Sequence, residues 1–83
     1  MLVLTGATSK RGRRMPKRVG KKIATLRHER GMSQTELAQK ARITRGYVSQ
    51  LERAMKSPTL EVFFRIAKAL HCDPRDMLTF NGH

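Results

Sequence analysis

Apolar residues recur at helical intervals through most of the chain from Val19 onward. Val19, Ile23 and Leu26 fall on one face of a first helix, which Gly31 ends as a C-terminal cap. No segment alternates between apolar and polar residues as a half-buried strand does, so the pattern predicts an all-α fold. The broadest apolar stripe predicts the best-defined helix and an aromatic contribution to the core; it consists of Leu60, Phe63, Phe64, Ala67 and Leu70.

Four capping signals divide the rest of the chain into further helices. Each is a Ser, Thr or Asp whose side-chain oxygen can accept a hydrogen bond from the first helical turn. The first is part of a capping box with Glu36, and a Pro stands beside each of the last two. The signals lie at Ser33, Thr44, Ser57-Pro58-Thr59 and Asp73-Pro74. We therefore expect a compact five-helix bundle, the last helix carrying Met77, Leu78 and Phe80.

The length of 83 residues allows one small core and therefore one domain with a tail. Residues 1–16 combine glycine and proline with basic residues and show no apolar periodicity, which predicts a basic arm that is disordered when unbound. We assign residues 17–80 to the domain and residues 81–83 to a C-terminal tail.

The charge is strongly positive, with 18 Lys and Arg residues against 6 Asp and Glu residues and a formal net charge of +12. Residues 1–22 contain eight of the basic residues and no acidic one, so the remainder carries 10 − 6 = +4. Such a charge on a small domain indicates a polyanionic partner. Nucleic acid is the first candidate, and an anionic membrane surface is the second.

Other features narrow the functional class. Cys72 is the only cysteine, which excludes an internal disulfide and favours a reducing, cytoplasmic setting. The apolar run at residues 1–4 is too short for a signal peptide, and no segment has membrane-spanning length. His28, His71 and His83 lack the spacing of metal ligands, and no nucleophile motif or phosphate loop is present. We expect no enzyme activity, no metal and no cofactor.

The segment from Gln34 to Leu51 has the apolar spacing of two short helices joined by a tight turn. Ala38 provides the small side chain that a close helix crossing needs. Such a unit can present its second helix, at about residues 44–53, to the major groove of double-stranded DNA. The remaining packing positions are all apolar: Leu37, Ala41, Ile43, Val48 and Leu51.

The sequence resembles the phage-repressor and Cro-like (XRE-type) family of helix-turn-helix transcriptional regulators over about residues 17–79. The resemblance is carried by Gly31-Met32-Ser33-Gln34-Thr35-Glu36-Leu37-Ala38, Tyr47-Val48-Ser49-Gln50-Leu51-Glu52-Arg53 and Ser57-Pro58-Thr59-Leu60. Two residues depart from it, since Arg42 and Ala54 stand where the family usually has glycine. A positive φ at Arg42 would cost about 1 kcal/mol.

The resemblance implies a set of DNA contacts. Arg45 could pair with guanine O6 and N7, and Gln50 with adenine N6 and N7, although each could instead contact phosphate or solvent. Gly46 would let the backbone approach the bases. The full set of implied base contacts is Thr44, Arg45, Gly46, Tyr47, Ser49 and Gln50.

The resemblance also implies contacts to the DNA backbone and one structural ion pair. Gln34, at the start of the second helix, and Lys56, in the loop after the third, would contact phosphate. Arg27 and Glu52 would form a partly buried ion pair between the first and third helices, with a second role for Arg27 at phosphate.

One short reading helix covers few bases, so we expect a homodimer on a pseudo-palindromic operator, formed through the fourth and fifth helices. Restriction-modification controller proteins are similar in size and in the Tyr-Val-Ser pattern. Two alternatives remain open: an antitoxin-type module that masks a toxin partner and binds DNA secondarily, and a cationic tail that binds RNA or membranes without specificity.

Overall fold

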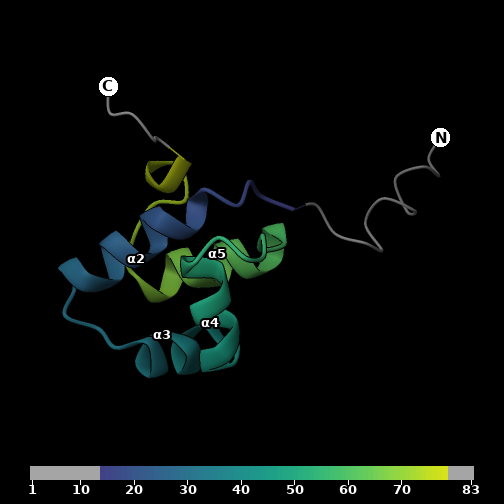
Figure 1. Cartoon of the computed structure of the whole chain (residues 1–83). Helices are drawn as coiled ribbons and strands as arrows, with labels where there is room; N and C mark the ends of the chain where they lie inside the picture. Colours follow the sequence, from purple (N-terminus) through teal and green to yellow (C-terminus); the bar gives the residue numbers. More distant parts are fainter. Residues whose placement is uncertain (1–13, 79–83) are drawn as a thin grey trace, which may run out of the picture.

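The computed structural model describes residues 14–78, which form four α-helices and one short 3-10 helix (Figure 1). The described residues contain no strand, only an isolated antiparallel bridge between Arg14 and Thr59, so the all-α prediction is confirmed for this part of the chain. In chain order the helices are α2 (Val19–Glu29), α3 (Gln34–Ala41), α4 (Arg45–Glu52), α5 (Leu60–Ala69) and η1 (Asp76–Leu78).

Several predictions concern residues outside this range. The expected arm before Arg14, Phe80 of the expected fifth helix and the tail at residues 81–83 all lie outside the described residues. The last three residues of the expected arm, 14–16, are described. Among the described helices, none combines the length and apolar character that crossing a membrane requires.

Three of the predicted helix starts are formed as expected. The side-chain oxygen of Ser33 accepts a hydrogen bond from the Glu36 amide at 3.0 Å, and that of Thr44 accepts one from the Tyr47 amide at 3.0 Å. Thr59 caps α5 in the same way through the Val62 amide, at 3.2 Å. Each cap satisfies an amide that has no partner inside the helix, which fixes where α3, α4 and α5 begin.

The prediction of five helices is wrong, because the described residues contain four α-helices and the fifth segment is one turn of 3-10 helix. The Asp73 carboxylate bonds the Arg75 amide two residues on, at 2.9 Å, instead of the amide three residues on. The amides of Asp76, Met77 and Leu78 then bond carbonyls three residues earlier, at 2.9 to 3.1 Å. This tighter pattern rarely continues beyond three or four residues.

The apolar side chains form one core to which every described helix contributes. The prediction that Phe64 lies in the core is wrong, because its side chain is 49% exposed, whereas Phe63 is buried. Adjacent residues on a helix lie about 100° apart, and Ile66, three residues after Phe63, takes the inward position. The buried hydrophobic residues are Val19, Ile23, Leu26, Leu37, Ala38, Ala41, Val48, Leu51, Phe63, Ile66, Ala67, Ala69, Leu70 and Met77.

The helices α3 and α4 cross and are supported from two sides, since α5 packs against α3 and α2 packs against α4 (Figure 1). Gly20 allows α2 and α4 to approach each other closely. A Cβ atom at Gly20 would lie 1.7 Å from the carbonyl oxygen of Leu51, far inside van der Waals contact. The backbones of α2 and α4 therefore touch where any other residue would hold them apart.

A buried ion pair joins α2 to α4 beside this contact. Arg27 Nε donates to Glu52 Oε2 at 2.6 Å and Nη2 donates to Oε1 at 3.0 Å, with side-chain exposures of 9% and 7%. Arg27 Nη1 also donates to the Met32 carbonyl at 2.8 Å. The hydrogen bond to Glu52 raises the pKa of Arg27 above its ordinary value despite burial. Burial alone would raise the pKa of Glu52, but hydrogen bonds from Arg27 and Gln34 and the Arg27 charge together lower it.

All four α-helices end in the same way, although only one has glycine at the critical position. After α2, Gly31 has φ +64°, and the equivalent residues after α3, α4 and α5 are Arg42, Ala54 and His71, with φ of 62°, 59° and 55°. In each case the next amide bonds a carbonyl five residues earlier, at 2.9 to 3.1 Å. This is the Schellman arrangement, in which a side chain at the left-handed position costs about 1 kcal/mol.

We expect Ala54→Gly to raise the free energy of unfolding by about 0.5 to 1 kcal/mol, because glycine adopts the left-handed backbone of Ala54 without strain. Urea denaturation checks this. The control is Ala24→Gly within α2, which should lower stability by up to about 1 kcal/mol. Equal effects of the two substitutions would contradict the assignment of strain to Ala54.

We expect Glu52→Gln to lower the free energy of unfolding by about 3 kcal/mol at pH 7, because it leaves the Arg27 charge buried without its partner. The lowered pKa of Glu52 means that its stabilisation is complete above the ordinary value of 4.5 and is lost as the pH falls through the lower pKa of the folded state. The variant should therefore lose less stability than the wild type on acidification below pH 4.5.

Denaturation at a series of pH values measures this difference. Asp73→Asn serves as the control, because the ion pair of Asp73 with Arg75 is exposed and screened by solvent. A Glu52→Gln variant with wild-type stability at pH 7 would show that the buried pair does not hold α2 and α4 together.

Candidate nucleic-acid interface

The crossing of α3 and α4 leaves one side of α4 exposed. Val48 and Leu51 of α4 are buried in the core, and Ala38 is buried on α3. The turn between the helices is closed by the Ile43 amide, which donates to the Ala38 carbonyl at 2.9 Å. Because the inward face of α4 is fixed by packing, its opposite face and its amino end form a defined outer surface.

All six residues predicted to contact bases lie at the amino end or on the outer side of α4. The first three, Thr44, Arg45 and Gly46, are exposed, and the other three, Tyr47, Ser49 and Gln50, are half-buried. The Thr44 oxygen is used as the helix cap. Apart from its chain neighbours and the backbone of its own helix, a Cβ atom at Gly46 would meet only the Thr44 hydroxyl oxygen among the described residues, at 4.0 Å, so the backbone there is open to approach from outside.

Gln34 connects this surface to the buried ion pair. Its Nε2 donates to Glu52 Oε1 at 3.0 Å, and its Oε1 accepts from Arg45 Nη1 at 3.0 Å. Glu52 accepts only, so it orients the Gln34 amide with the oxygen toward Arg45. A continuous line of polar contacts therefore runs from Arg27 through Glu52 and Gln34 to Arg45. The guanidinium of Arg45 has one nitrogen engaged by a neutral acceptor and presents its other donors outward.

The residues predicted to contact phosphate differ in how exposed they are in the structure. Arg27 is buried, and each of its three guanidinium nitrogens bonds a protein acceptor. Gln34 is half-buried at the first residue of α3. Lys56 is exposed in the loop after α4.

Lys56 lines a surface pocket of about 370 Å³ that also includes Arg14, Lys17, Tyr47 and Ser57. Arg14 is held there, because its Nη1 donates to the Ser57 carbonyl at 2.9 Å and the bridge to Thr59 fixes its backbone. No local sequence pattern predicts this pairing, because it joins residues 43 positions apart in the chain. Three cations thus meet beside Tyr47 at the edge of α4.

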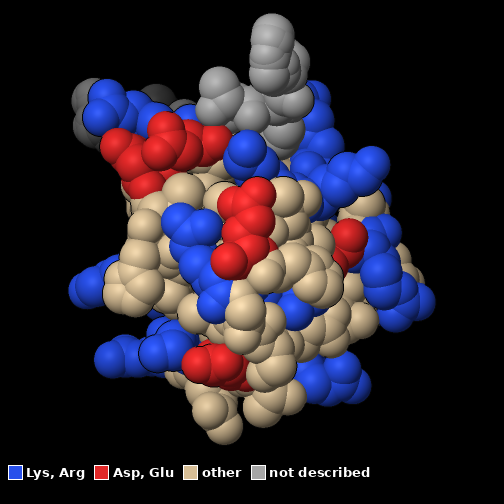
Figure 2. Space-filling model, turned by 90° about the vertical axis from the view of Figure 1, so that its left-hand side faces the viewer, with Lys and Arg blue, Asp and Glu red and all other residues tan. Residues whose placement is uncertain are grey.

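The positive charge alone does not select this surface. Figure 2 shows Lys and Arg side chains projecting along both edges of one face of the molecule, with acidic groups in separate patches between them. Cations are therefore present on several sides, and the outer face of α4 is distinguished by its geometry. Among the described residues, no group of three His, Cys, Asp or Glu side chains is arranged to hold a metal ion.

Comparison with known proteins gives the family. Residues 23–77 match the sequence profile of the helix-turn-helix family. The chain is 34% identical over 65 residues to the uncharacterized HTH-type transcriptional regulator y4dJ of Sinorhizobium fredii, which covers 78% of this chain and 84% of that protein.

Two solved structures have the same fold. The restriction-modification controller protein C.AhdI from Aeromonas hydrophila superposes with a TM-score of 0.71 at 32% identity, covering 76% of this chain and 94% of that one. The P22 c2 repressor, solved in complex with a synthetic operator, gives a TM-score of 0.69 at 27% identity, covering 76% and 96%. With its profile match, its relatives and its crossing of α3 and α4, the chain belongs to the helix-turn-helix family of the phage-repressor and Cro-like type.

Proposed function

We propose that this protein is a cytoplasmic transcriptional regulator that binds double-stranded DNA in a sequence-specific manner, with α4 in the major groove. The observation that carries the proposal is the exposed amino end of α4, where Arg45 and Gly46 face outward from a helix crossing of the helix-turn-helix type. The similar P22 c2 repressor was solved with an operator. A helix presented in this way fits the major groove, where each base pair displays a distinct pattern of donors and acceptors.

In this proposal Arg45 reads guanine through O6 and N7, and Gln50 reads adenine through N6 and N7. Ser49 and Thr44 donate to nearby acceptors, and Tyr47 lies beside a thymine methyl group or a phosphate. The contact of Arg45 with Gln34 supports the assignment, because it reduces the number of conformations that the long Arg45 side chain must give up on binding.

Phosphate groups on the two sides of the groove are bound by different parts of the protein. Gln34 contacts one strand at the amino end of α3, where the free amides and the helix dipole favour an anion. Lys56, together with Arg14 and Lys17, contacts the other from the pocket beside Tyr47. These contacts position α4 without distinguishing the bases.

We further propose that the protein binds its operator as a homodimer through α5 and η1. Phe64 on α5 and Leu78 on η1 are 49% and 41% exposed, which leaves two large apolar side chains on the expected dimer elements in contact with water. A second copy of the chain would cover them and would double the number of bases read. The likeness to C.AhdI favours a restriction-modification controller as the kind of regulator.

Selection of random duplexes at physiological salt tests the reading mechanism. We expect an enriched pseudo-palindrome. Arg45→Ala should remove the preference for one base in each half-site, a loss of about 1 to 3 kcal/mol in discrimination. Lys56→Ala, the comparison variant, should weaken binding to all sequences alike and reduce the salt dependence. Recovery of no motif would overturn the proposal and favour a protein-binding module of the antitoxin kind.

Sedimentation tests the dimer. We expect Phe64→Ser to shift the protein toward monomer and to weaken operator binding, because it removes an apolar contact from the proposed interface. Met55→Ser is the matched control, since Met55 is 54% exposed but lies in the loop between α4 and α5. Identical sedimentation of the wild type and the Phe64→Ser variant would place the dimer contact elsewhere.

A further inference from the structure

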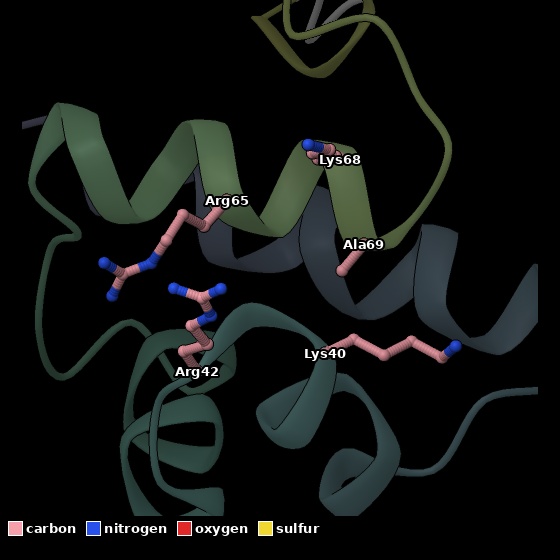
Figure 3. A pocket seen from close by; sticks show the side chains of 5 residues that line it. All are labelled: Lys40, Arg42, Arg65, Lys68 and Ala69. Carbon is pink, nitrogen blue, oxygen red and sulfur yellow. The ribbon is translucent and has the colours of Figure 1, made fainter.

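A second basic pocket is formed by residues that have no part in the proposed DNA contacts. It has a volume of about 320 Å³ and lies between the end of α3, the turn that follows, and the second half of α5 (Figure 3). Its lining residues are Lys40, Arg42, Arg65, Lys68 and Ala69. Four of these five residues are cations and none is acidic. Glu61, which is not part of the lining, pairs with Arg65.

The two arginines of the pocket differ in how they are held. Arg65 Nε donates to the Ala41 carbonyl at 2.9 Å and Nη1 donates to Glu61 Oε2 at 3.2 Å, which fixes its guanidinium and leaves Nη2 for other acceptors. The Arg42 side chain has no hydrogen bond or ion pair with any described residue. Figure 3 shows the two guanidinium groups near one another on the same side of the pocket, Arg65 reaching it from α5 and Arg42 from the turn after α3.

This arrangement is unfavourable for the protein alone. Two like charges that lie close together repel, and an anion bound between them relieves the repulsion. Arg42 also occupies the left-handed position after α3, with φ 62° and ψ 45°, where glycine would be unstrained. Ala54 and His71 adopt the same backbone at the ends of α4 and α5, so the strain belongs to the helix end, and it is the unpaired charge that distinguishes Arg42.

We propose that the pocket binds a small anion that carries two or more phosphate groups. The forked donors of Arg42 and Arg65 match pairs of phosphate oxygens. Lys40 and Lys68 extend away from the two guanidinium groups in Figure 3 and add to the positive charge around the pocket. A volume of about 320 Å³ lies at the small end of ligand pockets, which favours a compact polyphosphate. The site does not depend on the proposed reading of DNA, and its occupant would not compete with DNA for any residue.

Titration of the full ¹⁵N-labelled chain with sodium triphosphate at about 150 mM salt tests the proposal, since this salt screens general attraction to the net charge. We expect saturable shifts confined to amides around the pocket, including those of Ala41, Arg42, Arg65 and Ala69. Arg42→Gly should weaken binding about tenfold or more, because it removes one charged fork. This variant relieves the strain at the turn, so weaker binding would not reflect unfolding.

Arg53→Gln is the matched control, because Arg53 is an exposed arginine at the end of the next helix. It should leave triphosphate affinity nearly unchanged. Equal weakening by Arg42→Gly and Arg53→Gln, or shifts spread over the whole basic surface, would overturn the proposal by showing attraction to net charge alone. A random duplex tested in parallel should shift amides of α4; a duplex that instead shifts the pocket amides and displaces triphosphate would also overturn it.

Discussion

Arg27 on α2 and Glu52 at the end of α4 hold each other in a position where neither side chain is more than 9% exposed. Each charge is tolerable there only in the presence of the other, so the two helices must meet in one register. Gln34 then extends the same set of hydrogen bonds to Arg45 on the outer surface. One continuous polar network therefore fixes the register of α2 against α4 and extends to the first proposed reading side chain.

The sequence predicts those features of the fold that depend on interactions between residues close together in the chain. Ser33, Thr44 and Thr59 mark three helix starts because each cap bonds an amide only three residues away. The same reasoning failed after Asp73, where a bond two residues on favours a 3-10 turn. The pocket beside Tyr47 could not be predicted from the sequence, because it depends on backbone pairing between residues 14–15 and 57–59. Such pairing produces no periodic pattern of apolar residues.

Three of the four α-helices end in a left-handed residue that is not glycine, so glycine alone does not predict where helices of this protein end. Arg42, Ala54 and His71 adopt the backbone that Gly31 adopts, at a cost of about 1 kcal/mol each. Burial of Leu37 in α3, Leu51 in α4 and Leu70 directly after α5 contributes more than that, so packing determines where each helix ends and the residue adopts the required backbone. The departures from the family pattern at Arg42 and Ala54 therefore leave the fold intact, and the first of them places a charged side chain in the second basic pocket.

The contact of Gly20 with the Leu51 carbonyl has a consequence for the tolerance of the core to change. Apolar side chains can be exchanged for others of similar volume because they adjust their rotamers, whereas two backbones in van der Waals contact have nothing to adjust. The spacing of α2 and α4 is thus set by the contact between their backbones and not by the sizes of Ile23 or Val48. Apolar substitutions in the interior of this chain can therefore leave the outer edge of α4 in place, provided that position 20 remains glycine.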